Sequence, residues 1–207
     1  MSGHGLRLHD SPTSPFVRIV AVALRETGLE AETERVAASG TPLDPGSLPL
    51  AQNPLGKVPT LERADGPALY DSRVICRYLD HLGGGRLYPA PPRLWETLTL
   101  EATGHGIAEA ALLMIYEVRL RPEGARSRGW VEGQWDKVAR ALDAIEARWM
   151  SHLAGPLDMA QIAVACALGY LDFRHGARVW REGRPALSGW EARFAERPAM
   201  VATRPAG

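Results

Sequence analysis

Ser14 stands where a hydroxyl group can stabilise an anion. Before it, Leu6-Arg7-Leu8 alternates as strands do, and after it the segment 16–24 places apolar side chains on one helical face. Pro15 suits the first turn of that helix because proline has no amide hydrogen to satisfy there. The pattern predicts a strand, a loop and a helix, with unpaired amides and a favourable helix dipole beside the Ser14 hydroxyl.

Two later segments carry residues that suit the binding of charged groups. Lys57 precedes the dipeptide Val58-Pro59, and Asp71-Ser72 precedes an apolar helical pattern over 74–82. Asp71 or Ser72 can cap that helix, and the first amides of a helix hold carboxylates and other anions. Each feature alone is typical of a surface charge or a helix cap, so its significance depends on the order of all of them along the chain.

The segments around these residues predict a mixed α/β first half. A weaker alternating run covers 29–36, and a segment rich in Pro, Gly and Ser, 39–54, indicates a loop with room for one short helix. The runs 58–63 and 67–70 flank the turn signal Asp65-Gly66 and predict a hairpin. The order of elements is βαβ followed by ββα, with the last helix ending near residue 82.

The second half contains only helical patterns. Three glycines at 83–85 and Pro-Ala-Pro-Pro at 89–92 bracket a linker. Beyond it come a long helix over 94–120, weakened by Gly104 and Gly106, and a helix with a regular apolar seam over 131–149. We therefore expect an α/β domain at 1–82, a linker at 83–92 and an all-helical domain at 93–207.

Two capping boxes are predicted in the helical half. Asp158 with Gln161, and Ser188 with Glu191, have the spacing in which a cap side chain and a third-residue side chain satisfy each other's backbone amides. Each pair is expected to open a helix.

Composition and charge exclude several classes of protein. The 207 residues include 24 Lys and Arg and 24 Asp and Glu, so no net charge draws the chain to nucleic acid or to an anionic membrane. The longest apolar run, 162–171, is well short of the roughly 20 residues that a membrane span needs. The first residues lack the pattern of a secretory signal. We expect a cytoplasmic protein whose partners include neither nucleic acid nor membrane.

Cysteine and histidine usage indicates neither a disulfide nor a metal centre. Cys76 and Cys166 each lie within an apolar helical pattern, which favours two separate buried thiols. The six histidines show no metal-ligand spacing with the cysteines, so no metal is expected.

The ordered set of segments resembles the thioredoxin-like superfamily and, within it, the cytosolic glutathione transferases of the bacterial type with an active-site serine. Where glutaredoxins carry Cys-Pro-Tyr-Cys, this chain has Ser14-Pro15-Phe16-Val17, so dithiol exchange is excluded. The segment 53–61, Asn-Pro-Leu-Gly-Lys-Val-Pro-Thr-Leu, resembles the one that precedes the family's third strand. Leu69-Tyr70-Asp71-Ser72 resembles its acidic-Ser motif, and Ala160-Gln161-Ile162 stands where the family usually has Ala-Asp-Ile. The resemblance runs from about Leu6 to Ala199.

The resemblance implies glutathione as co-substrate and assigns roles to particular residues. Ser14 would donate its hydroxyl proton to the bound thiolate, with Ser11 and Thr13 as alternative donors. Phe16 belongs to the glutathione-binding set. The backbone of Val58, at a cis Val58-Pro59 bond, would pair with the cysteinyl part of glutathione, and Lys57 would reach its glycyl carboxylate. Asp71 would face the ammonium group of glutathione, and Ser72 with its helix amides would hold the γ-glutamyl carboxylate.

The resemblance also implies that the helical domain holds a small hydrophobic electrophile. His105, Tyr116 and Arg119 are possible pocket residues, and His105 stands where related bacterial members are expected to carry an acid. Members of the family are usually homodimers that act in detoxification, and both properties are expected here.

Two other functions remain open. A catalytically silent, transferase-shaped binding or regulatory protein would be expected to lack Ser14, Asp71 or Ser72, and all three are present. Glutathione-dependent isomerisation or dehalogenation needs the same thiolate and therefore the same residues. Binding to immobilised glutathione and a panel of electrophiles would distinguish these functions.

Overall fold

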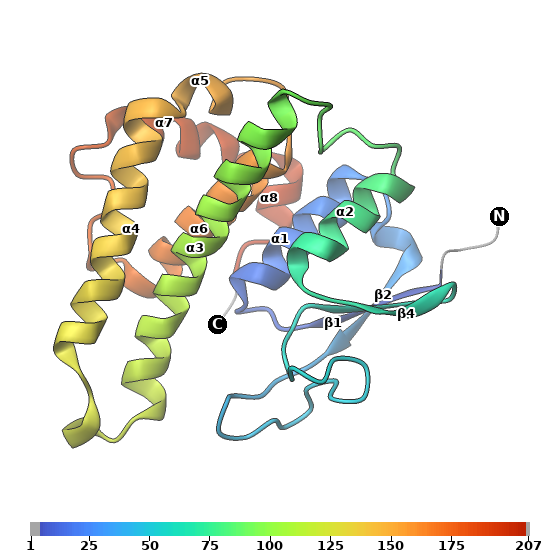
Figure 1. The fold of residues 1–207 in the computed structure, drawn as a ribbon, viewed down its shortest axis with the longest axis horizontal. Helices are drawn as coiled ribbons and strands as arrows, with labels where there is room; N and C mark the ends of the chain where they lie inside the picture. The colour runs from blue at the N-terminus through green and yellow to red at the C-terminus, as the bar shows by residue number, and fades with distance from the viewer. Residues whose placement is uncertain (1–4, 206–207) are drawn as a thin grey trace. The chain divides into compact units, whose positions relative to one another are not determined.

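The computed structural model describes residues 5–205, which form two compact units. One comprises residues 5–89 with 202–205, and the other is Ala90–Val201. Figure 1 shows strands and helices in the first unit and helices in the second.

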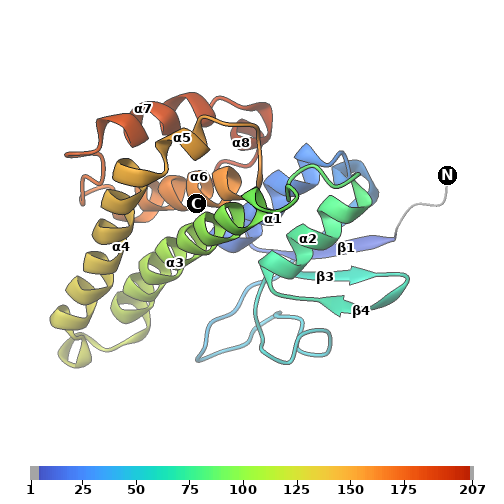
Figure 2. The ribbon, with the colours of Figure 1, turned by 45° about the horizontal axis from the view of Figure 1, so that its top comes forward.

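The first unit is built on a four-stranded sheet. Its strands are β1 (Leu6–Asp10), β2 (Thr33–Ala37), β3 (Thr60–Arg63) and β4 (Gly66–Leu69), in the order β2-β1-β3-β4. The β1–β2 pair is parallel, whereas β1–β3 and β3–β4 are antiparallel; Figure 2 shows β3 and β4 side by side. Leu8 pairs with Leu61 at the centre of the sheet, and both side chains are fully buried. This is the predicted βαβ-ββα order, and the thioredoxin-like fold is confirmed.

Two helices, α1 (Pro15–Glu26) and α2 (Ser72–Leu82), pack against each other on one face of the sheet, while the loop 38–59 lies on the other side (Figures 1 and 2). Their apolar faces form the core of this unit through Ile19, Leu24, Ile75 and Leu79, all fully buried. Each helix carries its apolar residues at the three- and four-residue spacing that an amphipathic helix requires. The N-termini of α1 and α2 are thereby fixed by burial of the rest of each helix.

Two details differ from the predicted elements. The second strand begins at Thr33 and not at Leu29, because Glu30–Glu32 form a 3-10 turn in which the Glu32 amide bonds the Leu29 carbonyl. The loop 39–54 contains turns and a bridge between Thr41 and Asp44, with no helix.

The second unit is all-helical, as predicted. Its helices are α3 (Arg93–Leu120), α4 (Arg128–Arg148), α5 (Met150–Leu153), α6 (Met159–His175) and α7 (Pro185–Phe194), followed by α8 (Pro198–Ala202). The seam of α4 buries Val138, Leu142 and Ile145. The central helix α6 is buried on almost every side, and it packs along α3.

Gly104 explains how α3 approaches α6 so closely. A Cβ atom on Gly104 would lie 2.7 Å from the carbonyl carbon of Ala163, a contact that no side chain tolerates. Gly106, by contrast, has open space around it. One of the two glycines that weaken the α3 pattern is therefore required by packing.

The first capping box is confirmed and the second is wrong. The Asp158 carboxylate accepts the Ala160 and Gln161 amides, and the Gln161 side chain accepts the Asp158 amide at 2.8 Å. Ser188 lies inside α7, which begins three residues earlier at Pro185. Glu191 instead forms an ion pair with Arg181 at 2.8 Å.

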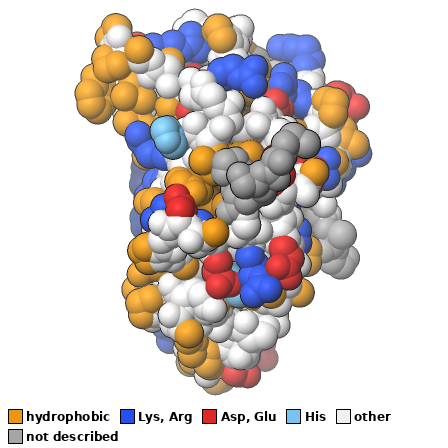
Figure 3. Space-filling model, turned by 90° about the vertical axis from the view of Figure 1, so that its right-hand side faces the viewer, with side chains coloured by type: hydrophobic (Ala, Val, Ile, Leu, Met, Phe, Trp, Pro, Cys, Tyr) orange, Lys and Arg blue, Asp and Glu red, His pale blue; other side chains and the backbone are white. Residues whose placement is uncertain are grey.

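Both cysteines are free and buried, as expected from their positions on apolar helix faces. Within residues 5–205, no group of three His, Cys, Asp or Glu side chains is arranged to hold a metal ion. No helix in this range is both long and apolar enough to cross a membrane. On the face drawn in Figure 3, basic and acidic side chains are interspersed with apolar ones.

Candidate active site

Ser14 is the N-cap of α1. Its hydroxyl oxygen accepts a hydrogen bond from the Val17 amide at 3.3 Å, and its backbone is extended, as an N-cap requires. Pro15 occupies the first helical position and the first turn contains no acidic residue. Because a hydroxyl can accept and donate at once, the Ser14 proton stays available to an anion placed at this helix end.

The turn before α1 contains the two alternative donors. Ser11 and Thr13 are half-buried, and the Ser11 carbonyl accepts the Ser14 amide at 3.0 Å. This bond closes the turn between β1 and α1 and fixes the Ser14 backbone. Ser14 alone of the three hydroxyls caps the helix and so is aligned with its dipole.

Asn53 organises the loop that contains the predicted backbone-binding segment. Its side-chain amide donates to the Lys57 carbonyl and to the Thr60 hydroxyl, each at 3.1 Å, and its side-chain oxygen accepts the Leu55 amide at 3.0 Å. The Thr60 hydroxyl also donates to the Lys57 carbonyl at 2.9 Å. Asn53 is 1% exposed and Thr60 is fully buried, so the path of the chain up to Val58 is determined by buried side chains.

Lys57, Val58 and Pro59 follow in this loop. The Val58-Pro59 peptide bond is cis, as the resemblance implied. Lys57 is exposed and its ammonium group forms no ion pair within residues 5–205. The backbone of this segment is therefore anchored, while a positive charge is available beside it.

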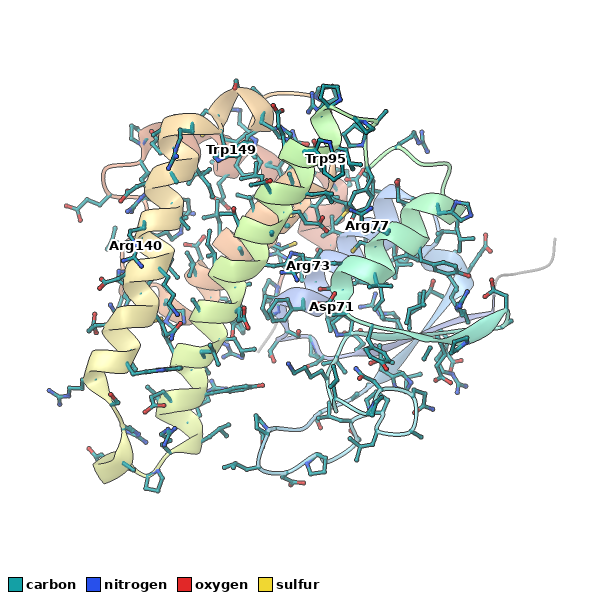
Figure 4. The ribbon with its side chains drawn as sticks, in the orientation of Figure 1. Asp71, Arg73, Arg77, Trp95, Arg140 and Trp149 are labelled. Carbon is teal, nitrogen blue, oxygen red and sulfur yellow. The ribbon has the colours of Figure 1, made fainter. Side chains whose placement is uncertain are left out.

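Asp71 and Ser72 lie at the start of α2, and Figure 4 shows Asp71 there, followed on the same helix by Arg73 and Arg77. Asp71, not Ser72, is the N-cap: its carboxylate accepts the Arg73 amide at 3.0 Å. The carboxylate is exposed, and its second oxygen is 3.9 Å from the Arg73 guanidinium. Ser72 is 1% exposed at the first helical position.

Three predicted pocket residues lie on α3 of the helical unit, in two environments. His105 is 2% exposed, and its Nδ1 lies 3.0 Å from the Glu101 carbonyl oxygen one turn earlier. Tyr116 is half-buried, and burial raises the pKa of its hydroxyl. Arg119 is exposed and acts electrostatically on Tyr170 of α6, as Tyr116 does. The structure thus groups Tyr116 and Arg119 with Tyr170, and leaves His105 bonded to its own helix.

Two grooves in the described part of the chain lie elsewhere. One of about 590 Å³ is lined by residues of α5 and α7, including Trp190 and Phe194. Another of about 460 Å³ borders β1 near Arg7 and Glu34. Neither groove includes a predicted site residue; those residues lie at the helix ends, in the anchored loop and on α3.

Comparisons with known proteins identify the family to which the chain belongs. Residues 13–82 match the model of the glutathione S-transferase N-terminal domain, and residues 128–193 match that of the C-terminal domain. The chain is 31% identical over 204 residues to the uncharacterised GST-like protein YibF of Escherichia coli K12, covering 97% of this chain and 98% of YibF. The chain belongs to the glutathione transferase family.

Solved structures of other glutathione transferases are also similar to this chain. A member from Pseudomonas fluorescens Pf-5 with bound glutathione is 44% identical, with a TM-score of 0.95, over 98% of this chain and 100% of that one. A second structure from the same organism contains S-(propanoic acid)-glutathione and is 43% identical, with a TM-score of 0.90, over 97% and 100% of the two chains.

The sequence did not predict the residues that support the candidate site of this glutathione transferase. Asn53 and Thr60 stood in the recognised segment without a role, although a buried Asn before a Pro-Gly turn is a signal for loop anchoring. Tyr170 and Arg174 lie in an apolar helical pattern, where no local signal separates them from core and surface residues. The proximity of Tyr170 to Tyr116 depends on the packing of α3 against α6.

Proposed function

We propose that this protein is a glutathione transferase in which the Ser14 hydroxyl stabilises the thiolate of bound glutathione. The observation that carries the proposal is the Ser14–Val17 bond at 3.3 Å, because it holds the hydroxyl oxygen at the α1 N-terminus and leaves the proton to donate. The sulfur of glutathione is the nucleophile, and Ser14 remains chemically unchanged.

The energies required are within reach of these groups. A free thiol has a pKa of about 8.5, and lowering that pKa by two units requires about 2.7 kcal/mol of differential stabilisation. A hydrogen bond to a charged group contributes roughly 1.5–3 kcal/mol, and a helix N-terminus roughly 0.3–1 kcal/mol, more when partly buried. Ser14 and the α1 dipole together supply this amount.

Glutathione would be bound by the first unit through its charged ends and its backbone. Lys57 would bind the glycyl carboxylate, the Val58 backbone would pair with the cysteinyl part, and Phe16 would lie beside Ser14. The γ-glutamyl group would bind at the α2 N-terminus, with its carboxylate held by Ser72 and the helix amides and its ammonium facing Asp71. The exposed Lys57 ammonium and Asp71 carboxylate support these assignments, since both charges are accessible.

The helical unit would hold the electrophile, with Tyr116, Arg119 and His105 as candidate contacts. During transfer the thiol proton leaves to solvent and a sulfur lone pair forms a bond to the electrophilic carbon. In a substitution the leaving group departs with its bonding pair of electrons. In an addition the carbanion that forms takes up a proton. The relative that binds S-(propanoic acid)-glutathione supports products whose sulfur substituent ends in a carboxylate.

We further propose a cytoplasmic homodimer acting in detoxification, with a glutathione-binding domain at 1–82, a linker at 83–92 and an electrophile-binding domain at 93–207.

The proposal is tested by measuring glutathione binding and conjugation on the purified full chain. We expect retention on immobilised glutathione, an ultraviolet thiolate signal of bound glutathione at neutral pH, and turnover of an activated aryl halide. Binding without a thiolate signal or turnover would support a silent binding protein, and absence of binding at millimolar glutathione would overturn the proposal.

A further inference from the structure

Two neighbouring helices of the helical unit bring two tyrosines and two arginines together. Tyr116 and Arg119 are three residues apart on α3, and Tyr170 and Arg174 are four apart on α6, so each pair shares one helix face. Arg174, Tyr116 and Arg119 all lie close enough to Tyr170 to act electrostatically on it. We call these four residues the Tyr-Arg cluster.

The close packing of α3 and α6 holds the cluster in place. Gly104 lies directly against the backbone of Ala163, and His175 Nε2, at the end of α6, is 2.9 Å from the Ala111 carbonyl oxygen on α3. Tyr170 is 2% exposed, and the Arg174 guanidinium lies 4.0 Å from the Phe173 ring centroid. The cluster therefore stands on two fixed helices, with at least one tyrosine and one arginine held by packing.

The positive charge of the cluster is not balanced by a carboxylate. Three acidic residues of this region have other arginine partners: Glu117 pairs with Arg121, Glu132 with Arg178, and Asp172 with Arg181. Neither Arg119 nor Arg174 forms an ion pair within the range 5–205. No carboxylate is among the groups that act on Tyr170. Two guanidinium groups are thus available to an external anion.

Both tyrosine hydroxyls remain neutral donors at physiological pH. Burial raises the pKa of Tyr170 and of Tyr116, so neither hydroxyl ionises near neutrality. Arginine and tyrosine side chains together provide the planar, charged and neutral donors that a carboxylate accepts. The half-buried Tyr116 and Phe173 rings add apolar groups to the same region.

We infer that the electrophile carries a carboxylate or a similar acidic group, and that the Tyr-Arg cluster binds it. The inference rests on the proposed function and adds to it the substrate class and two specificity-determining residues, Tyr170 and Arg174. The apolar part of such an electrophile lies against the aromatic rings, and its acidic group pairs with the guanidinium groups.

The test compares two electrophiles that carry an anionic carboxylate or a neutral carboxamide at the same ring position, 4-chloro-3-nitrobenzoate and 4-chloro-3-nitrobenzamide, with glutathione and the full chain. In both reactions the glutathione sulfur bonds to the ring carbon, chloride leaves with the bonding pair, and the thiol proton goes to solvent. The kcat/KM of each electrophile is divided by its uncatalysed rate with glutathione. We expect this ratio to be about tenfold or more higher for the benzoate than for the benzamide.

Variants identify the groups responsible for this preference. Arg174→Gln is expected to lower the benzoate kcat/KM by about five- to tenfold, mainly through KM, and to leave the benzamide kcat/KM within twofold. Arg140→Gln, an exposed arginine on α4 (Figure 4), is the matched control and should change neither. Tyr170→Phe keeps the buried ring and should lower only the benzoate reaction.

The outcomes separate the inference from the proposed function. Equal turnover of both electrophiles, or equal losses for both in Arg174→Gln, would overturn the inference while the transferase function stands. No turnover of either electrophile together with no glutathione binding would overturn the proposed function itself.

Discussion

The Ser14 hydroxyl oxygen and the Val17 amide are joined by the hydrogen bond that caps α1, at 3.3 Å. The same oxygen therefore serves the fold as an acceptor and leaves its proton to serve chemistry as a donor. In the proposed function, stability and activity are coupled at this residue, so a substitution must be examined for both.

Ser14→Ala should lower kcat/KM for conjugation about ten- to hundredfold, because it removes a hydrogen bond to a charged sulfur. It should raise the pKa of bound glutathione, measured from the ultraviolet thiolate signal against pH. The lost cap should also lower the free energy of unfolding by roughly 1 kcal/mol. Ser11→Ala and Thr13→Ala are the matched controls; if one of them abolished the thiolate signal and Ser14→Ala did not, the donor would be reassigned.

Asn53→Ala should loosen the loop that precedes Val58. The substitution removes the hydrogen bonds of Asn53 to the Lys57 carbonyl, the Thr60 hydroxyl and the Leu55 amide, and each hydrogen bond contributes about 0.5–1.5 kcal/mol. We expect a lower melting temperature and a raised KM for glutathione, measured by thermal denaturation and initial rates. Gln52→Ala, one residue away and half-buried, should change neither quantity; similar effects from both variants would contradict a specific anchoring role.

Gly104 and Gly106 should respond in opposite directions to alanine. Gly104→Ala forces a Cβ to within 2.7 Å of the Ala163 carbonyl carbon and must push α3 away from α6. Gly106→Ala meets nothing within 4 Å and should stabilise the helix by about 0.5–1 kcal/mol. Denaturant titration of both variants measures the difference, and a stabilised Gly104→Ala protein would show that the two helices separate easily.

Asp158→Ala should be strongly destabilising because its buried carboxylate serves more than a cap. It accepts the Thr97 hydroxyl at 3.1 Å and lies 2.8 Å from His152 Nε2, besides capping α6. We expect a loss of about 3 kcal/mol or more, compared with roughly 1 kcal/mol for a cap alone. Thr97→Val, which removes one donor, should lose less. Glutathione should still bind to the folded fraction of Asp158→Ala, and an unchanged melting temperature would contradict this role.

His175 should make stability fall in mild acid. Burial lowers its pKa, while the Ala111 carbonyl bond opposes the shift and Arg178 and Arg174 add to it. In the unfolded chain the pKa is near its ordinary value of 6.5, so the unfolded state binds the proton first. This contribution is complete above pH 6.5 and is lost as the pH falls below that value towards the folded-state pKa.

The pH prediction is checked by denaturant titration at neutral and mildly acid pH. His175→Gln should weaken the acid-induced loss of stability, because glutamine can donate to the carbonyl without titrating. His81→Gln, at an exposed position on α2, should retain the full dependence. An identical pH dependence in His175→Gln and the parent protein would exclude His175 as a source.

Local physics made several parts of this protein predictable from the sequence. Ser14 followed by Pro15, and Asp158 followed by Gln161, are helix starts because each side chain satisfies backbone amides within three residues of itself. Apolar spacing likewise identifies the helices, and the Asp65-Gly66 turn identifies the hairpin. Ser188 with Glu191 had the same spacing and was misleading, because Glu191 pairs with Arg181 ten residues away.

The amino-acid order by itself thus determined the element types, the helix caps and the family's recognition segments, since these depend on contacts between near neighbours. The tertiary structure alone decided that Gly104 lies against Ala163, that Asn53 anchors the Lys57 carbonyl, and that Tyr170 joins Tyr116. For the helix pairs the physical reason is distance along the chain: Gly104 and Tyr116 lie more than fifty residues from their partners. For Asn53 the physical reason is burial. A buried side-chain amide must find a partner within the protein, whereas the same group in an exposed loop could bond to water.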